Sequence, residues 1–372
     1  MSTTSQARQR INSLLDENSF VEIGALVTAR ATDFNLKQNE TPADGVVTGY
    51  GVIGGNLVYV YSQDASVMGG SVGEMHAKKI ANLYDLAMKT GAPVIGLIDS
   101  AGLRLQESTD ALNAFGQIYL KQTNASGVIP QITAVFGNCG GGLALIPTLT
   151  DFTFMEEKKA KLFVNAPNAL DGNEVSKCDS ASAAFQSEQS GIVDVVADEA
   201  SLLAQIRELV AMLPSNNVED DSIVDCTDDL NRASAELVNC VGDTAIALAT
   251  ISDNNVFFEV KGNYAKDMVT GFIKLDGVTV GAVANRTEVY ADGAVAEKFD
   301  AVLTANGCDK AADFINFCDA FQIPVLSLTN VKGFKATKCS EKRIAKAVAK
   351  LTYAFANATV PKVNVVIGKA YG

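Results

Sequence analysis

The chain has 372 residues, of which 48% are apolar, and its formal net charge is −13. This acidity argues against nucleic acid as the main partner, because a phosphate backbone would be repelled. No apolar run approaches the ~20 residues that cross a bilayer, and residues 1–17 lack the apolar core of a signal peptide. We therefore expect a cytoplasmic protein.

Cysteine and histidine usage narrows the chemistry further. The seven cysteines lie at irregular spacings without a Cys-x-x-Cys pair, which excludes a zinc ribbon and favours free thiols. The single histidine, His76, excludes a multi-histidine metal site, and a Ser-His-Asp triad would have to use it. We expect no metal in this chain and a surface or helix-capping place for His76.

The first predicted elements are helices and strands in alternation. Residues 6–27 predict an amphipathic helix and a short strand, and residues 45–63 predict a β-hairpin. Residues 77–90 carry apolar side chains at helical spacing and end at Gly91, a residue that suits a left-handed helix terminus. The apolar run at 94–98 is typical of a buried parallel strand. This order predicts an α/β fold.

The second half of the chain repeats the spacing of prolines and glycines found in the first half. A helix over 310–321 precedes a strand over 325–328. Five residues of the first half recur 231 positions later in the same order: Pro93, Gly102, Pro130, Gly137 and Gly141 as Pro324, Gly333, Pro361, Gly368 and Gly372. We infer a duplicated domain, with one copy over 1–213, an acidic linker over 214–231 and a second copy over 232–372. The second copy stops level with Gly141, so we expect it to be truncated at its C-terminus.

Two short motifs suggest functions that their context argues against. Residues 49–54 match the dinucleotide pattern G-x-G-x-x-G, but a strand follows where that motif needs a helix, so a hairpin turn is the better interpretation. Residues 87–90 resemble the Ala-Met-Lys-Met of biotinylated carriers. They lie on the last turn of a helix, whereas a biotinyl lysine lies on an exposed hairpin, so we reject this interpretation.

A glycine loop follows a predicted buried strand at residues 137–142. Glycines leave consecutive backbone N–H groups uncovered, and such groups can bind a developing oxyanion. An ordinary strand-to-helix turn remains the alternative. A second loop at the matching place, residues 368–372, favours the functional interpretation. Two related oxyanion-binding loops suit a reaction in which each of two substrates develops an oxyanion.

Many segments in one order carry a resemblance to a known family. They read ADGVVTG at 43–49, GGSVGEMHAKKI at 69–80, GAPVIG at 91–96, DSAGLRLQE at 99–107, ASGVIPQ at 125–131, LTDFTFM at 149–155, NYAK at 263–266, FCDAFQIP at 317–324, ATVPKV at 358–363 and KAYG at 369–372. The chain resembles the carboxyltransferase subunit of biotin-dependent acyl-CoA carboxylases and decarboxylases. This resemblance implies two crotonase-like domains.

The resemblance also implies an activity, the transfer of a carboxyl group between biotin and the α-carbon of an acyl-CoA. Backbone N–H groups of Gly140 and Gly141 would hold the thioester oxygen, and Gly372 would belong to the loop that holds the biotin ureido oxygen. The remaining assigned residues are Ala101, Gly102, Gly137 and Gly142 on the acyl-CoA side, and Gly333, Phe334 and Tyr371 on the biotin side.

Cofactors and partners follow from the same resemblance. Biotin would arrive on a separate carrier protein, and a biotin carboxylase or a membrane decarboxylase subunit would be a further partner. The family's active site lies between subunits, so we expect a homo-oligomer. The absent zinc ribbon favours propionyl-CoA and methylmalonyl-CoA as the substrate pair.

The chain departs from the family at two loops. Asn138 stands where the family has proline, and Lys332 replaces the proline of a Pro-Gly-Phe motif. Two other functions stay open: a crotonase-type hydratase or isomerase without biotin, and a non-catalytic CoA-binding assembly subunit.

Overall fold

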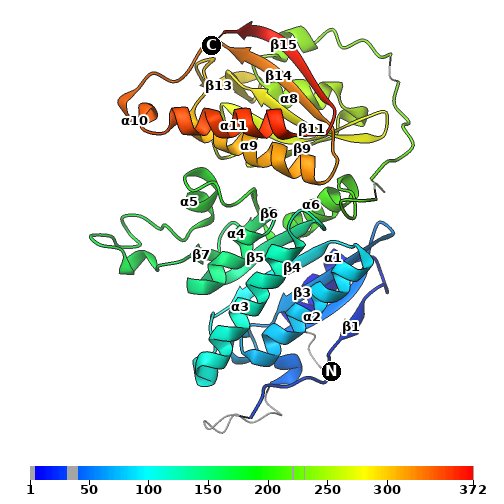
Figure 1. Cartoon of the computed structure of the whole chain (residues 1–372), viewed down its shortest axis with the longest axis vertical. Helices are drawn as coiled ribbons and strands as arrows, with labels where there is room; N and C mark the ends of the chain where they lie inside the picture. Colours follow the sequence, from blue (N-terminus) through cyan, green and yellow to red (C-terminus); the bar gives the residue numbers. More distant parts are fainter. Residues whose placement is uncertain (1–4, 32–40, 220–221, 230, 372) are drawn as a thin grey trace. The chain divides into compact units, whose positions relative to one another are not determined.

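The computed structural model describes residues 5–31, 41–219, 222–229 and 231–371. The chain forms two compact units, Met1–Glu219 and Asp220–Gly372, which Figure 1 shows coloured from blue to red along the sequence. Both are mixed α/β, as predicted. No helix in the described ranges has the length and apolarity needed to cross a membrane.

A mixed sheet forms the centre of unit 1. Its strands follow the order β1-β2-β3-β4-β5-β6-β8, and β7 pairs with β5. The first three strands are antiparallel, and the pairs from β3 onward are parallel. Their bounds are β1 Val21–Ile23, β2 Val46–Ile53, β3 Asn56–Gln63, β4 Val94–Ser100, β5 Gln131–Gly140, β6 Phe152–Glu156, β7 Lys161–Phe163 and β8 Val195–Ala197.

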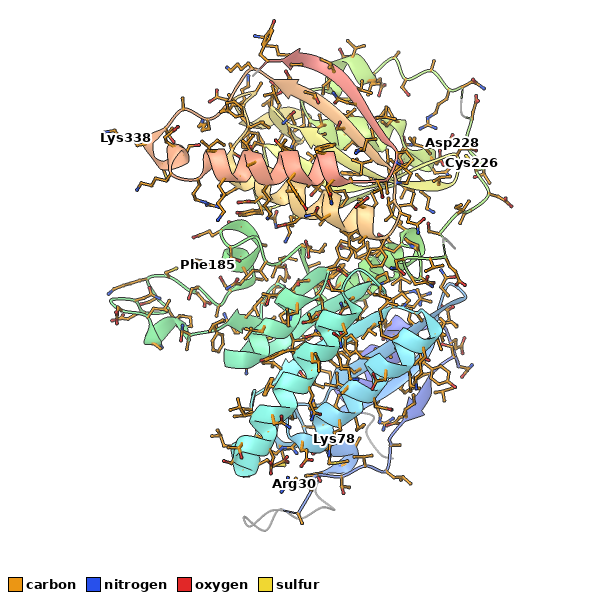
Figure 2. All side chains as sticks on the ribbon, in the orientation of Figure 1. Arg30, Lys78, Phe185, Cys226, Asp228 and Lys338 are labelled. Atoms are coloured by element: carbon orange, nitrogen blue, oxygen red, sulfur yellow. The ribbon has the colours of Figure 1, made fainter. Side chains whose placement is uncertain are left out.

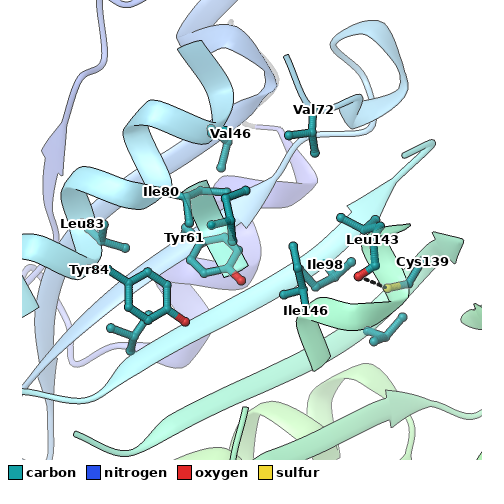
Figure 3. Packing of buried hydrophobic residues seen from close by; sticks show 14 of the residues in the cluster. Val46, Tyr61, Val72, Ile80, Leu83, Tyr84, Ile98, Cys139, Leu143 and Ile146 are labelled. Carbon is teal, nitrogen blue, oxygen red and sulfur yellow. Dashed lines mark hydrogen bonds between the residues drawn. The ribbon is translucent and has the colours of Figure 1, made fainter. Parts of the chain in front are cut away.

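Helices enclose this sheet. The helices α2 and α3 pack side by side on it, and α1 and α6 pack against each other and against its strands. The helix bounds are α1 Gln6–Leu14, α2 Glu74–Thr90, α3 Ser108–Ala125, α4 Leu145–Leu149, α5 Ala183–Glu188 and α6 Glu199–Met212. Figure 3 shows the core between α2 and the sheet, where Tyr61, Ile80 and Ile98 are buried.

Glycines set the two local turns that the sequence predicted. Gly54 and Gly55 have φ values of 57° and 88°, and they form the two-residue turn of the β2–β3 hairpin. The G-x-G-x-x-G motif is therefore part of a hairpin and has no helix after it. At the end of α2, Gly91 adopts the left-handed conformation with φ of 63°, as expected.

Unit 2 contains a five-stranded sheet and a separate hairpin within its described residues. The sheet order is β15-β14-β11-β10-β9. The strand bounds are β9 Phe257–Val260, β10 Met268–Leu275, β11 Val278–Asn285, β12 Glu288–Ala291, β13 Ala294–Lys298, β14 Val325–Val331 and β15 Lys362–Ala370. The helix bounds are α7 Leu237–Cys240, α8 Thr244–Ile251, α9 Ala305–Ala320, α10 Lys338–Glu341 and α11 Ile344–Asn357.

The two sheets share one strand pattern. Strands β1 to β5 and strands β9, β10, β11, β14 and β15 each run as two antiparallel pairs followed by two parallel pairs. The last pair shifts register in both sheets, with Ser100 opposite Cys139 in unit 1 and Val331 opposite Ala370 in unit 2. These partners are 231 residues apart in the sequence, like the repeated glycines.

Gly96 provides a test of the packing in unit 1. A Cβ atom at Gly96 would lie 2.3 Å from the hydroxyl oxygen of Tyr61, whose side chain is fully buried. We expect Gly96→Ala to lower the free energy of unfolding by about 1–3 kcal/mol, because the ring cannot move aside. Urea denaturation measures this loss.

Gly116 is the matched control, since it lies in α3 and a Cβ there would meet no atom within 4 Å. Gly116→Ala should raise the free energy of unfolding by about 0.5–1 kcal/mol through helix propensity. Equal stability of the two variants would contradict the packing around Tyr61.

Candidate active site

The glycine loops of unit 1 lie where β4 and β5 end. The chain after β4 passes through exposed Ala101 to Gly102, whose φ is 95°. A Cβ at Gly102 would lie 3.6 Å from the carbonyl oxygen of Gly140 at the end of β5. Residues that the sequence separates by almost forty positions are thus neighbours at one edge of the sheet.

At this edge of the sheet, Gly141 has free space beside its Cα atom. Its φ is 63°, and a Cβ there would meet no atom within 4 Å. Its neighbours are held: Gly140 lies against the ring of Phe163, and the carbonyl of Gly142 accepts a hydrogen bond of 2.6 Å from the hydroxyl of Tyr119. The loop therefore leaves open space beside the Cα of Gly141, while both neighbouring glycines are held.

Gly137 lies beneath the side chain of Asp99 rather than in the open. A Cβ at Gly137 would lie 2.0 Å from Oδ1 of Asp99. Oδ2 of Asp99 in turn accepts a 3.1 Å hydrogen bond from the buried guanidinium of Arg10. The conformation of the loop thus requires glycine at 137 for close packing.

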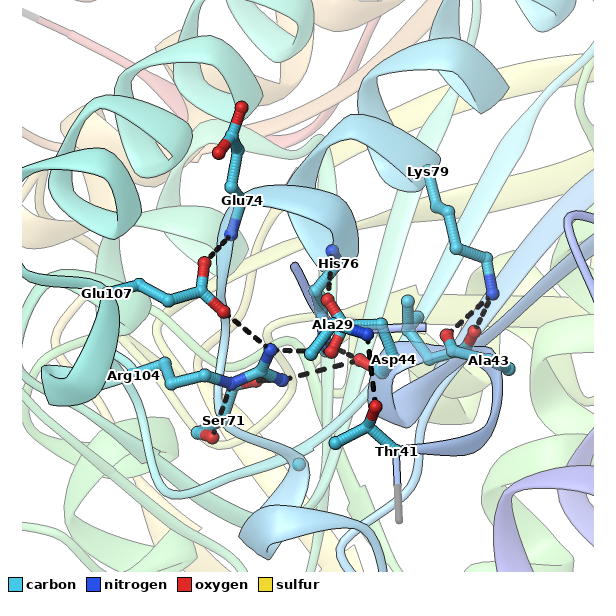
Figure 4. A network of polar contacts seen from close by, with 12 residues as sticks. Ala29, Thr41, Ala43, Asp44, Ser71, Glu74, His76, Lys79, Arg104 and Glu107 are labelled. Atoms are coloured by element: carbon cyan, nitrogen blue, oxygen red, sulfur yellow. Dashed lines mark hydrogen bonds and ion pairs between the residues drawn. The ribbon is translucent and has the colours of Figure 1, made fainter. Parts of the chain in front are cut away.

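A cluster of buried charges lies beside the loop after β4 (Figure 4). Arg104 is fully buried, and its Nη1 lies 2.5 Å from Oδ1 of Asp44 and 2.9 Å from Oε1 of Glu107. Its Nη2 donates to the carbonyl of Ser71 at 2.7 Å. Burial raises the pKa of Asp44, while the guanidinium of Arg104 opposes that rise.

The usual expectation that charged side chains of a loop are exposed is therefore wrong for Arg104 and Glu107, which lie inside. It holds for Asp110, which is exposed and pairs at 2.6 Å with Arg30 on the surface of unit 1 (Figure 2).

His76 belongs to the same cluster, so its predicted surface or capping place is wrong. The ring is fully buried, with Nδ1 3.0 Å from the carbonyl oxygen of Asp44 and Nε2 3.2 Å from Nε2 of Gln63. A carbonyl can only accept, so Nδ1 carries the proton and Nε2 accepts from Gln63. Burial, and then the charge of Arg104, lower the pKa of His76 to about 3.

Two buried lysines occupy matching places in the two units. Nζ of Lys79 donates to the carbonyls of Ala43, at 2.8 Å, and Val46. Nζ of Lys310 donates to the carbonyls of Lys261 and Tyr264, each at 2.8 Å. Burial lowers the pKa of Lys79 to about 8 and that of Lys310 to about 7. Sequence analysis missed both, although they are 231 residues apart.

The predicted biotin-side residues lie at the ends of β14 and β15. Gly333 has φ of 145° and open space around it, and Phe334 next to it forms a bridge with Leu303. The backbone N–H of Tyr371 donates to the carbonyl of Val331 at 2.8 Å. Gly372, the last predicted residue, lies outside the described residues.

A cavity of about 500 Å³ opens beside β14 and β15, and its lining includes Thr329, Asn364 and Tyr371. In unit 1 the matching face of β4 packs against Leu143 and Ile146 (Figure 3). Over the ranges that the structure describes, no group of three or more histidine, cysteine or acidic residues could hold a metal ion.

Comparisons with known proteins agree on one family. The model of the carboxyl transferase domain family matches residues 3–372. Methylmalonyl-CoA decarboxylase subunit alpha of Veillonella parvula is 42% identical over 98% of this chain and 72% of its own length. Propionyl-CoA carboxylase beta chain of Roseobacter denitrificans is 41% identical with the same coverage.

A solved structure, the hexameric transcarboxylase 12S with methylmalonyl-CoA and methylmalonic acid bound, superposes with a TM-score of 0.88. The two sequences are 38% identical, and the superposition covers 97% of this chain and 71% of the transcarboxylase chain.

The single histidine makes the buried cluster testable by NMR. We expect the His76 imidazole to stay neutral, protonated on Nδ1, down to about pH 4, because its folded pKa is about 3. Nitrogen-15 chemical shifts of a histidine-labelled sample measure this directly. The unfolded ring would titrate near 6.5. Stability from neutral His76 is thus complete above pH 6.5 and falls toward pH 3. A ring that titrates near 6.5 in the folded chain would contradict the burial.

Proposed function

This chain belongs to the carboxyl transferase domain family, and we propose that it moves a carboxyl group between biotin and a short acyl-CoA, propionyl-CoA or methylmalonyl-CoA. The family match along residues 3–372 confirms the resemblance inferred from sequence, and with it the prediction of an enzyme, a carboxyltransferase subunit. The observation that carries the proposal is the open glycine loop at the ends of β4 and β5.

We infer that the two units are copies of one crotonase-like domain. The shared strand pattern and the matching register shift support this inference. A second support is the crossing of a polar side chain over glycine: Gly368 lies beneath Asn330 in unit 2, as Gly137 lies beneath Asp99 in unit 1. Each copy would thus provide one oxyanion site.

Unit 1 would bind the acyl-CoA. Backbone N–H groups of Gly140 and Gly141 would stabilise the thioester oxyanion by roughly 3–4 kcal/mol per donor. Ala101, Gly102, Gly137 and Gly142 would shape the loop around it. Such stabilisation favours loss of a proton or of CO2 at the α-carbon, because the resulting enolate carries its charge on that oxygen.

Among the residues that the structure describes, Cys139, His76 and Asp99 are poorly suited to act as a side-chain base at this hole. Burial raises the pKa of the Cys139 thiol far above its usual value, so it stays neutral. His76 is buried and neutral, and Asp99 is paired with Arg10. A hydratase or isomerase without biotin needs such a group, so no observation favours that alternative.

Unit 2 would accept biotin. When bound, biotin on its carrier protein would supply the carboxyl group and a basic ureido nitrogen. The open backbone at Gly333 and the rings of Phe334 and Tyr371 suit a small, flat, neutral group. Gly372 would complete the ureido site.

The substrate pair and partners are proposals that draw on relatives. The relatives include methylmalonyl-CoA decarboxylase and propionyl-CoA carboxylase subunits, and transcarboxylase 12S binds methylmalonyl-CoA as a hexamer. We propose a homo-oligomer that works with a biotin carboxyl carrier protein and with a biotin carboxylase or a membrane decarboxylase subunit. The cytoplasmic location stays a prediction from composition.

Transfer of radiolabelled carboxyl from methylmalonyl-CoA to free biotin tests the function. We expect biotin-dependent loss of label from the CoA ester and formation of propionyl-CoA. Binding of CoA esters without transfer would instead support the non-catalytic assembly subunit.

Gly141→Val tests the role of the loop. At φ of 63° valine is strained, and its branched side chain would fill the open space that the thioester oxygen needs. We expect the transfer rate to fall at least about 100-fold, the loss typical of removing one oxyanion donor. The carboxyl-transfer assay measures the rate, and circular dichroism measures folding.

The matched control is Gly54→Val. Gly54 has φ of 57° and equally open surroundings, but it lies in the hairpin before β3, at the amino end of the parallel strands. The control should share the strain and keep the transfer rate. Wild-type transfer by Gly141→Val would remove this loop from the reaction.

A further inference from the structure

We propose that Arg104 is a positioning residue for the acyl-CoA hole: it holds the loop after β4 in the conformation that places Gly102 beside Gly140. The inference rests on the proposed function, because it concerns the same loop. It assigns to the buried cluster of Figure 4 a role in substrate alignment.

The guanidinium of Arg104 joins three segments that are far apart in sequence. It contacts Asp44 before β2, Ser71 before α2 and Glu107 after the loop itself. Glu107 extends the contacts, since its Oε2 accepts from the backbone N–H of Glu74 at 2.6 Å. The loop is thus tied to the start of α2 and to the turn that precedes β2.

Backbone hydrogen bonds through Val72 connect Arg104 to Gly102. The N–H of Val72 donates to the carbonyl of Gly102 at 2.8 Å, and the N–H of Arg104 donates to the carbonyl of Val72 at 3.0 Å. Any displacement of Arg104 would therefore move Gly102 away from the carbonyl of Gly140.

The same network also holds the chain on the other side of Ala101. The carbonyl of Asp44 accepts from His76, and His76 accepts from Gln63. Oε1 of Gln63 accepts a 3.2 Å hydrogen bond from the backbone N–H of Asp99, the residue that covers Gly137. Asp99 and Arg104 thus flank the loop, and both belong to one buried network.

The backbone around the network is strained. Ala43 and Asp44 have φ of 54° and 50°, and Ser108, next to Glu107, has φ of 49° with ψ of −125°. Each such residue costs about 1–3 kcal/mol, and such conformations persist only where the surroundings fix them. Buried ion pairs contribute little net stability compared with apolar packing. A fixed geometry is therefore the better explanation for this cluster.

Unit 2 offers an internal comparison. Its loop keeps the backbone pairing, since the N–H of Lys335 donates to the carbonyl of Leu303 at 2.9 Å. The side chains differ: Lys335, 231 residues after Arg104, forms a surface pair with Asp300, and the position that matches Glu107 is Lys338. Backbone pairing alone can shape such a loop, so the buried cluster serves a need particular to unit 1.

Two variants test the proposal in the carboxyl-transfer assay. Glu107→Gln removes one charge with little change in shape, and Arg104→Lys keeps the charge but cannot reach all partners. We expect both to raise the KM for methylmalonyl-CoA about tenfold and lower kcat, since small displacements at a reacting centre have large effects. The KM for free biotin should stay within about twofold of wild type, because unit 2 is unchanged.

Leu209→Ala is the matched control for stability. Leu209 is fully buried in α6, away from the loop, and its truncation destabilises unit 1 through a cavity. At an equal loss of melting temperature, the control should keep the wild-type KM for methylmalonyl-CoA. An unchanged KM in Glu107→Gln and Arg104→Lys, or an equal rise in Leu209→Ala, would overturn the positioning role.

Calorimetric binding of propionyl-CoA separates this inference from the proposed function. If the wild type binds the ester but transfers no carboxyl group, the proposed function fails while weaker binding by the two variants still supports the positioning role. If wild type and variants bind equally, the positioning role fails alone. If the wild type binds no CoA ester, both are wrong.

Discussion

The site depends on one close crossing between neighbouring parallel strands. Asp99 at the end of β4 lies across Gly137 of β5, at a distance that leaves no room for a Cβ atom. The register of the two strands shifts at this crossing, between Ile98 and Ser100, so the chain leaves the regular ladder. Residues 140–142, the last part of the glycine loop, follow the point where that ladder ends. Unit 2 repeats the arrangement with Asn330 over Gly368, and Oδ1 of Asn330 accepts from the N–H of Lys369 at 3.0 Å. In both units a planar, oxygen-bearing side chain lies over glycine, charged in unit 1 and neutral in unit 2.

Local rules explain what the sequence could predict. The hairpin at 46–63, the end of α2 at Gly91 and the buried strand β4 follow from glycine geometry, helix periodicity and an apolar run. The repeat predicted that two glycine loops lie at matching strand ends.

The burial of charged residues was harder to predict, because burial of Arg104 depends on Asp44 and Ser71, which lie sixty and thirty-three residues earlier. Read locally, residues 99–110 look like a solvated rim. The lysine pair Lys79 and Lys310 was a usable signal, since the repeat retains both, and each bridges two carbonyls of the turn before a hairpin.

The two units solve the same structural task with different side chains. In unit 1 a buried arginine, two carboxylates and a neutral histidine surround the loop. Unit 2 has a surface ion pair between Lys335 and Asp300 at the matching place. The backbone bridges Val72–Leu103 and Leu303–Phe334 are common to both. Side-chain chemistry has therefore diverged around a retained backbone, and the added polar network lies on the side proposed for the acyl-CoA.

This asymmetry fits the way in which the two proposed substrates would arrive. Biotin would be tethered to a carrier protein, and a tether raises the effective concentration of a group without any new contact. An acyl-CoA arrives from solution, and its hole must align the α-carbon and the thioester oxygen by its own contacts. Alignment of that kind requires groups that are already fixed before the substrate binds. A loop whose flanking residues are both tied into one buried network meets this requirement, whereas a loop held by its backbone and a surface ion pair can adjust to a tethered partner.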